Sequence, residues 1–362
     1  MTKRVYNLNP GPAVLPEPVL EEMKENLISF PGVGMSILEM SHRSSAFENI
    51  LNGAIEDMRK LANIPNDYHI LFVGGGASLQ FSMVPMNFMP PANKADYIVT
   101  GAWSKKAVKE AKRVGKVNIA ASSESENFKR IPKQDELKLD PEASYVHFTS
   151  NNTIFGTQFS TEPIVGNVPL ICDASSDIFS KAIDVSKYAV IYAGAQKNLG
   201  PAGVTIVFVR DDMLSRCQDS LHTMLNYKTH TENNSLYNTP PVFAIYTVGL
   251  VLKWLLKNDG LDAMAKLNDE KAKLLYDCID NSDGYYRGHA EKESRSKMNI
   301  PFRLPSEELE KKFVKESAEA GFAGLKGHRS VGGLRASIYN AFPLQGVKDL
   351  VEFMKEFQKK NS

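Results

Sequence analysis

The chain contains few cysteines and has almost no net charge. Its 362 residues include three cysteines, Cys172, Cys217 and Cys278, which are widely spaced and form no Cys-x-x-Cys pair. This pattern indicates neither a disulfide framework nor a zinc or other metal site, and we expect buried or unreactive thiols. The 43 basic and 42 acidic residues leave a formal net charge of +1. Nucleic acids and anionic membranes bind a clustered basic excess, so neither partner is expected.

Long hydrophobic runs are also missing. Residues 1–12 carry Lys3 and Arg4 but no apolar core after them, which is not the pattern of a secretory signal. The most apolar stretch, 242–256, is interrupted by Lys253 and is shorter than the ~20 residues that a bilayer span requires. We therefore expect a cytoplasmic protein with no membrane partner, in which residues 242–256 form a buried helix.

Apolar strands alternate with helical patterns from about residue 35 to residue 256. Strands are predicted at 69–73, 96–100, 144–148, 168–172, 189–192 and 204–209. This alternation is typical of an α/β protein with a mostly parallel sheet. Later residues predict a long amphipathic helix over 261–279, a strand near 298–304, a charged helix over 306–320, a glycine-rich strand region that ends at 339 and a last helix over 345–359.

The chain length predicts two domains, because 362 residues exceed what one hydrophobic core usually serves. The pattern changes near residues 257–260, where we place the linker. The predicted division is an N-terminal arm (1–15), a large domain (16–257) and a smaller C-terminal α/β domain (258–362).

Lys197 follows the apolar strand at 189–192, within the small-residue run 193–197. Such a lysine reaches the edge of the sheet partly desolvated, and desolvation lowers its pKa toward the range useful for carbonyl chemistry. Asp173 follows the strand at 168–172. Either residue alone is more often a cap or a solvated side chain. The pair matches what pyridoxal phosphate needs, an amine for the aldehyde and an acid for the pyridinium nitrogen.

Other residues near strand ends are candidates for the same site. Gly74-Gly75-Gly76-Ala77-Ser78 lets the backbone approach a ligand, and the next helix offers free amides to a phosphate, although such turns are equally often structural. Trp103 can stack on a pyridine ring or simply pack in the core. Thr153 can offer its hydroxyl to the ring oxygen or the phosphate of the cofactor. Residues 238–241, Asn-Thr-Pro-Pro, predict a capped helix start whose amides can also bind phosphate.

Six segments together resemble the phosphoserine aminotransferases, a family of class V, fold type I pyridoxal-phosphate enzymes. They are Asn9-Pro10-Gly11-Pro12, Ser41-His42-Arg43, residues 74–78, Trp103, Ala195-Gln196-Lys197-Asn198 and Lys326-Gly327-His328-Arg329-Ser330-Val331-Gly332-Gly333-Leu334-Arg335-Ala336-Ser337. The resemblance spans nearly the whole chain. The last segment is the most specific, because cysteine desulfurases and other class V relatives share the cofactor residues but not Lys-Gly-His-Arg-Ser.

The resemblance implies a seven-stranded-type sheet and a cytoplasmic homodimer with shared sites. The implied reaction moves an amino group between glutamate and 3-phosphohydroxypyruvate and gives phosphoserine and 2-oxoglutarate. In many bacteria the family also acts on a phosphorylated hydroxythreonine analogue in vitamin B6 synthesis. Lys197 is the implied Schiff-base lysine and catalytic base, Asp173 the partner of the ring nitrogen, and Trp103 the stacking residue.

The resemblance further implies which residues hold the cofactor's phosphate and phenolic oxygen. These are Ala77, Ser78, Thr153 and Gln196, together with Asn238 and Thr239 of the neighbouring subunit. Some members of the family carry Arg-Gly where this chain has Ala77-Ser78. The side-chain contacts of the phosphate at this pair therefore stay open, whereas the backbone amides are unaffected.

The implied substrates require two anion sites. Glutamate and phosphoserine each carry an α-carboxylate and a distal anion, and guanidinium groups bind such oxyanions in bidentate fashion. Arg335 resembles the family's α-carboxylate clamp. Arg43 with His42 resembles the distal-anion site, and His328 and Arg329 add charge for a phosphate dianion. Isolated pairs of this kind are often surface cations, but the glycines that follow argue against that alternative.

Three alternatives remain open from the sequence. A class V lyase or desulfurase needs a mobile catalytic cysteine, whereas Cys172, Cys217 and Cys278 are predicted to lie in a strand, a helix and a helix. An aminotransferase of the serine-glyoxylate type would share the cofactor site but lack a phosphate pocket. A non-enzymatic anion-binding module would give a colourless protein.

Overall fold

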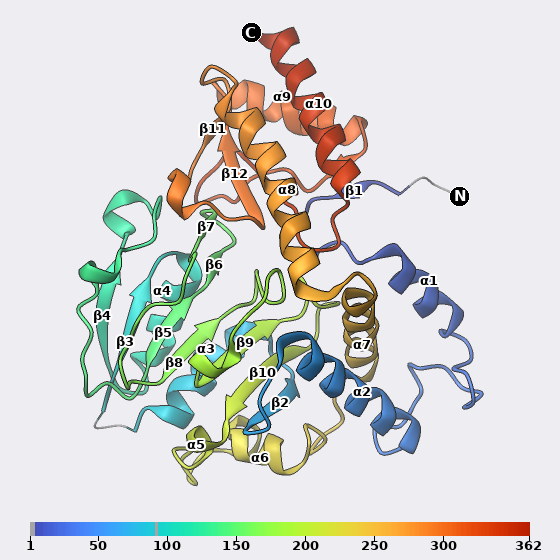
Figure 1. Ribbon diagram of the computed structural model, residues 1–362, viewed down its shortest axis with the longest axis vertical. Coiled ribbons are helices and arrows are strands. Elements are labelled where there is room, and N and C mark those ends of the chain that lie inside the picture. Colours follow the sequence, from blue (N-terminus) through green and yellow to red (C-terminus); the bar gives the residue numbers. More distant parts are fainter. Residues whose placement is uncertain (1–3, 91–92) are drawn as a thin grey trace.

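A seven-stranded sheet forms the centre of the protein in the computed structural model, which describes residues 4–90 and 93–362 (Figure 1). From one edge to the other the strands are β2 (Tyr68–Val73), β10 (Thr205–Arg210), β9 (Val190–Gly194), β8 (Leu170–Asp173), β5 (Val146–Thr149), β3 (Lys94–Val99) and β4 (Lys116–Ser122). Strand β10 is antiparallel to both neighbours and the other pairs are parallel. The predicted mostly parallel α/β sheet is confirmed.

Alternate strand residues enter two apolar cores, because successive side chains of a strand point to opposite faces. The first core contains Phe148 and Cys172 and is covered by α2 (Ser45–Ala62) and α7 (Val242–Lys257). The second core contains Ile171 and Tyr192 and is covered by α3 (Gly76–Phe88) and α4 (Ala102–Ala111). The sheet is therefore buried on both faces. The remaining helices of this region are α1 (Glu17–Glu25), α5 (Asp211–Leu214) and α6 (Tyr227–Glu232).

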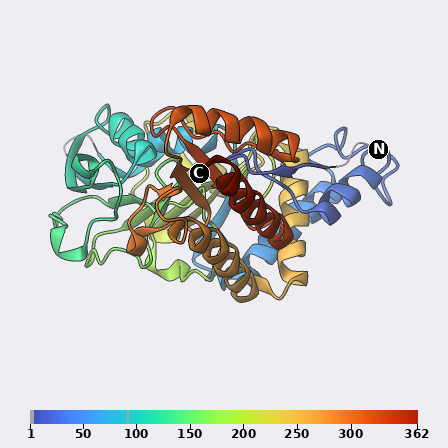
Figure 2. The ribbon, with the colours of Figure 1, turned by 90° about the horizontal axis from the view of Figure 1, so that it is seen from above.

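The C-terminal third builds a third core around a three-stranded antiparallel sheet of order β11-β12-β14. Its elements are α8 (Gly260–Asp280), β11 (Arg287–Gly288), β12 (Asn299–Arg303), α9 (Glu307–Glu319), β13 (Phe322–Ala323), β14 (Leu334–Ser337) and α10 (Leu344–Asn361). Helix α8 extends from the large sheet to this region, and the C terminus lies at its far end (Figures 1 and 2). The helices and the strand predicted after residue 260 are present within two residues of their expected bounds.

The N-terminal arm packs on the C-terminal third rather than on the sheet that follows it in the sequence. Strand β1 (Tyr6–Asn7) pairs in parallel with β13, and Leu8 is completely buried in the third core. The Tyr339 hydroxyl donates to Pro10 O over 2.8 Å, and Ala13 N donates to Gln196 O over 2.8 Å. The arm thus connects the third core to the loop that carries Lys197.

Polar groups join the two sheets at the middle of α8. Asn340 N donates to Asn198 Oδ1 over 3.1 Å, and Asn268 Nδ2 donates to Asn340 Oδ1 over 2.9 Å. The fully buried Lys271 donates its ammonium hydrogens to three carbonyl oxygens, those of Ile338, Tyr339 and Phe342, over 3.0, 2.7 and 3.2 Å. Burial lowers the pKa of Lys271 to about 7. Because Asn198 follows Lys197, this cluster holds the lysine loop against β14.

Three local predictions are corrected or completed. Cys217 was expected in a helix, but α5 ends at Leu214 and Cys217 lies in the turn after it. The expected cap of α7 is wrong, because Pro241 occupies the N-cap position without a side-chain hydrogen bond. Helix α7 is the buried helix predicted over 242–256, and across the described ranges no helix is long and apolar enough to cross a membrane.

Candidate active site

Lys197 lies in the turn that follows β9, at the carboxyl end of the sheet. Its Nζ donates to Thr153 Oγ1 over 2.7 Å. Burial lowers its pKa to about 8; the nearby Asp173 opposes this shift and the Arg335 charge adds to it. At a pH near this pKa about half of the lysine is a neutral amine, and a neutral amine is the form that attacks a carbonyl carbon.

Asp173 ends β8, beside the strand that leads to Lys197, and is 3% exposed. Its Oδ1 accepts a hydrogen bond from Ser175 N over 3.0 Å. Burial raises the pKa of this carboxyl, while the Ser175 hydrogen bond and the Lys197 charge oppose the rise. Among the described residues no cation is hydrogen-bonded to Asp173. A buried carboxylate of this kind favours a cationic ligand group, such as a protonated ring nitrogen, because the charge of that group offsets part of the cost of removing the carboxylate from water.

Trp103 lies in the first turn of α4, with its indole close to two amines. Lys197 Nζ is 5.7 Å from the ring centroid and Lys106 Nζ is 4.1 Å from it. The indole Nε1 is buried without a hydrogen-bond partner in the described part of the chain. The strand end before α4 is fixed by Asn152, whose Oδ1 would lie 2.5 Å from a Cβ atom at Gly101. Close packing of this kind holds the indole next to Lys197.

Thr153 belongs to a loop between the short strands β6 (Asn151–Asn152) and β7 (Thr157–Gln158). The loop is pressed against β12, since Gly156 has a φ of +68° and a Cβ atom there would lie 2.2 Å from Pro301 Cδ. Only glycine fits such a position without displacing the proline. The Thr153 carbonyl accepts from Arg335 Nη1 over 3.2 Å. The loop therefore connects Lys197 with Arg335 of β14, because Thr153 is hydrogen-bonded to both.

Arg335 is 5% exposed and contributes a buried cation to the same place. Its Nε has no hydrogen-bond partner among the described residues. Buried donors are nearly always satisfied in proteins, so an unpaired guanidinium nitrogen beside Lys197 favours an anionic ligand.

The glycine loop and α3 offer a second anion site. Gly75 and Gly76 have φ values of +84° and +65°, and α3 begins at Gly76 with no side chain capping its first amides. Ala77 and Ser78 lie in this first turn. Free amides at a helix N-terminus bind a phosphate through hydrogen bonds and the helix dipole. Gln196 packs against Gly194, where a Cβ atom would lie 2.6 Å from Gln196 Oε1.

His328 and Arg329 lie on the loop between β13 and β14. His328 Nδ1 accepts from Ser330 N over 3.2 Å. Burial lowers the pKa of His328, and the charges of Arg335, Arg329 and Lys106 lower it further. The loop also touches the large domain, since Val331 packs against the second core. The charges of Arg335, Arg329 and Lys106 thus all act on His328, and Lys106 also lies over the Trp103 ring.

Four predicted residues lie outside the immediate surroundings of Lys197 in their own chain. His42 and Arg43 precede α2, and Asn238 and Thr239 precede α7. Within residues 4–90 and 93–362, no hydrogen bond or ion pair connects any of them with Lys197. His42 Nε2 is buried without a partner in this range, and Asn238 and Thr239 line a hollow with Gly74 and Gly75. Lys106 was not predicted, although its position three residues after Trp103 places both on one helix face.

Comparison with known proteins decides the family. The model of the aminotransferase class-V family matches residues 5–350. The chain belongs to the class V aminotransferases. Within this family it is similar to the phosphoserine aminotransferase of Lysinibacillus sphaericus, 55% identical over 361 residues, and to that of Desulfosudis oleivorans, 56% identical over 363 residues; both alignments cover 100% of each chain.

Solved structures of class V aminotransferases have the same fold. Phosphoserine aminotransferase from Bacillus circulans subsp. alkalophilus superimposes with a TM-score of 0.98 at 52% identity and covers 100% of both chains. The PLP-bound phosphoserine aminotransferase of Trichomonas vaginalis gives a TM-score of 0.92 at 40% identity, covering 97% of this chain and 100% of that one. The expected fold of a class V aminotransferase is confirmed.

Proposed function

We propose that this protein is a phosphoserine aminotransferase, which transfers the amino group reversibly between glutamate and 3-phosphohydroxypyruvate and gives O-phospho-L-serine and 2-oxoglutarate. The observation that carries the proposal is the end-to-end match, at 55% identity, to a relative of that name. The cluster of Lys197, Asp173 and Arg335 agrees with it, because a transaminase needs a reactive amine, an acid for the ring and a clamp for the α-carboxylate.

The cofactor is pyridoxal phosphate, and the side chains near Lys197 fit it. The buried Asp173 carboxylate suits the protonated ring nitrogen, the uncapped amides of α3 suit the phosphate, and Trp103 lies beside the lysine for stacking on the ring. When bound, the cofactor supplies the electron sink that stabilises negative charge at the substrate Cα. Thr153, Ala77, Ser78 and Gln196 are the proposed further contacts.

The chain's own residues then orient the substrate and move the proton. Arg335 binds the α-carboxylate and fixes the Cα beside Lys197. Lys197 Nζ, whose pKa is about 8, would act as the general base that takes the proton from the substrate Cα and passes it to the aldehyde carbon of the bound cofactor. Asp173 keeps the proton on the ring nitrogen through its negative charge. His328 and Arg329 bind the distal anion, which is a phosphate or a carboxylate.

A homodimer with shared sites is part of the proposal. His42, Arg43, Asn238 and Thr239 form no described bond with Lys197 of their own chain, and the orphaned His42 Nε2 supports a ligand from elsewhere. We assign His42 and Arg43 to the distal anion, and Asn238 and Thr239 to the cofactor phosphate, of the partner subunit's site. The cytoplasm as location and the phosphorylated hydroxythreonine analogue as a second substrate belong to the same proposal.

The division into an arm (1–15), a large domain (16–257) and a small domain (258–362) stays a proposal as well. It is supported by the separate third core. Residues 6–8 pack on that core, so the arm is associated with the small domain rather than with the large one.

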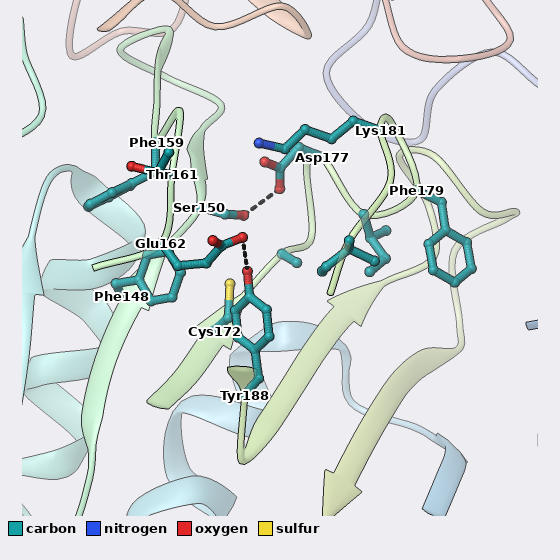
Figure 3. Close-up of a pocket in the computed structure, with 13 residues that line it drawn as sticks. Phe148, Ser150, Phe159, Thr161, Glu162, Cys172, Asp177, Phe179, Lys181 and Tyr188 are labelled. Atoms are coloured by element: carbon teal, nitrogen blue, oxygen red, sulfur yellow. Dashed lines mark hydrogen bonds between the residues drawn. The ribbon is translucent and has the colours of Figure 1, made fainter. Parts of the chain in front are cut away.

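A desulfurase is not favoured, because its reaction needs a thiolate that can reach the substrate. Cys172 lies on the first-core face of β8, opposite to the face of Asp173, in a small hollow beside Tyr188 and Glu162 (Figure 3). The Tyr188 hydroxyl donates to Glu162 Oε1 over 3.0 Å. Burial raises the pKa of Cys172 well above its usual value and that of Cys217 to about 11, and it also raises the pKa of Cys278.

The test is a coupled assay of pure protein with phosphoserine and 2-oxoglutarate, alongside the same assay with serine and glyoxylate. We expect glutamate to form from phosphoserine and little turnover of serine. Release of alanine from cysteine, preferential turnover of serine, or a protein with no visible absorbance after incubation with the cofactor would each overturn the proposal in favour of one alternative.

A further inference from the structure

Lys106 is a cation at the candidate site that none of the assigned roles uses. It lies one helical turn after Trp103 on α4, and its Nζ is 4.1 Å from the centroid of the indole. The indole ring is also 5.7 Å from Lys197 Nζ. Two amines therefore lie near one aromatic side chain, and Lys197 already has a catalytic assignment.

Among the described residues, the charge of Lys106 is not neutralised by an ion pair. The neighbouring Lys105 forms an ion pair with Glu124, whereas Lys106 has no carboxylate partner within the described ranges. An ammonium on an indole face at an exposed position is held only weakly, since water competes for it. Lys106 is therefore free to exchange the indole for a stronger, anionic partner.

The field of Lys106 reaches the residues proposed for the distal anion. Three cations lower the pKa of His328 in addition to burial, namely Arg335, Arg329 and Lys106, and among the described residues none of the three forms an ion pair with a carboxylate. Like charges that gather without counter-charge repel one another, so the cluster gains most from a ligand with two negative charges. A phosphate dianion supplies these, and a carboxylate supplies only one.

We propose that Lys106 is a substrate-binding residue that selects phosphate over carboxylate at the distal end of the substrate. Its ammonium rests on Trp103 when no substrate is bound and contacts the phosphate oxygens of phosphoserine or 3-phosphohydroxypyruvate in the complex. Lysine suits this role, because it binds phosphate as a mobile point charge where arginine binds through a fixed fork. The inference rests on the proposed function.

The test compares Lys106→Gln with Lys109→Gln in the holoenzyme. Lys109 is the matched control, an exposed lysine one turn further along α4. Loss of a charge-assisted contact predicts that Lys106→Gln lowers kcat/KM for phosphoserine about tenfold, mainly through KM, and leaves glutamate within about twofold. Inorganic phosphate should also inhibit Lys106→Gln about tenfold more weakly than the parent, for the same reason. Lys106→Arg keeps the charge but not the mobile ammonium and should recover part of the loss, whereas Lys109→Gln should match the parent.

Two results would overturn the inference. Equal losses for phosphoserine and glutamate in Lys106→Gln would mean that the lysine only positions Trp103. Unchanged kinetics and unchanged inhibition by phosphate would mean that it stays on the indole or in solvent. Failure of the underlying function is distinguishable, because the parent and Lys109→Gln would then also leave phosphoserine unreacted.

Discussion

At pH 8 about half of the Lys197 side chains carry a neutral amine, because burial lowers the pKa of this group to about 8. The neutral fraction is roughly 9% at pH 7 and roughly 91% at pH 9 for that pKa. Only the neutral amine attacks the aldehyde of the cofactor, so covalent uptake by cofactor-free protein should accelerate about tenfold between pH 7 and pH 9 and then level off. A lysine with its ordinary pKa near 10.4 would accelerate about a hundredfold over this range and continue to rise.

Uptake can be followed by adding pyridoxal phosphate, reducing samples with borohydride at intervals and weighing the protein by mass spectrometry. Reaction of the cofactor with α-N-acetyllysine, measured at each pH, corrects for titration of the cofactor itself. Two variants move the midpoint in opposite directions. Asp173→Asn removes a charge that raises the pKa of Lys197 and should lower the midpoint, whereas Arg335→Met removes a charge that lowers it and should raise the midpoint. A parent profile without a plateau by pH 9.5, or two shifts of the same sign, would refute this account of Lys197.

Three further outcomes follow from the same structure. Arg329→Ala should lower kcat/KM for phosphoserine roughly ten- to a hundredfold and for glutamate less, whereas Arg335→Ala should lower both, since charge-assisted contacts contribute about 1.5–3 kcal/mol; equal losses in Arg329→Ala would place the phosphate elsewhere. Lys197→Ala and Thr239→Asp should each be nearly inactive, yet a mixture refolded together should regain about a quarter of parental activity, because half of the dimers are mixed and each has one intact site. An inactive mixture in which tagged mixed dimers are present would assign Thr239 to its own subunit. Lys271→Met should lower the free energy of unfolding in urea at pH 9 by about 2–4 kcal/mol, because buried carbonyls lose their donor. The loss should be smaller at pH 6, because the native state then holds a proton on a lysine whose pKa burial lowers to about 7; a loss below about 1 kcal/mol at pH 9 would mean that water replaces the amine.

The strand pattern was predictable where both faces of a strand are buried. The segment at 190–194 is apolar along its whole length because helices cover both faces of the sheet, and its signal is strong in the sequence. In β4 all of the first four residues are half-exposed or exposed, so the segment lacks a continuous apolar run. For this reason residues 116–122 were not predicted as a strand. The antiparallel direction of β10 depends on how the chain returns to the sheet, and no local pattern of residues 205–210 encodes it.

The candidate site was predictable where a residue follows a strand end. Lys197 and Asp173 meet at one sheet edge because parallel strands place their carboxyl ends together. The hydrogen bond from Lys197 to Thr153 was not predictable, because it depends on the contact of Gly156 with Pro301 across 145 residues of chain. Lys106 carried a local signal, its spacing of three from Trp103, and only the position of the 326–332 loop makes that spacing relevant to a ligand.

The pairing of β1 with β13 sets the order in which a newly made chain can complete its site. Tyr6 leaves the ribosome early, but its partner Phe322 is synthesised 316 residues later. At roughly 5–20 residues per second, the arm waits about 15–60 s for the strand that holds it. Ala13 bonds to Gln196 next to the lysine, so the lysine loop stays unsupported on that side during the wait. Interrupted translation products would thus contain a nearly complete large sheet without a finished site, and cofactor capture would distinguish complete chains from nascent ones.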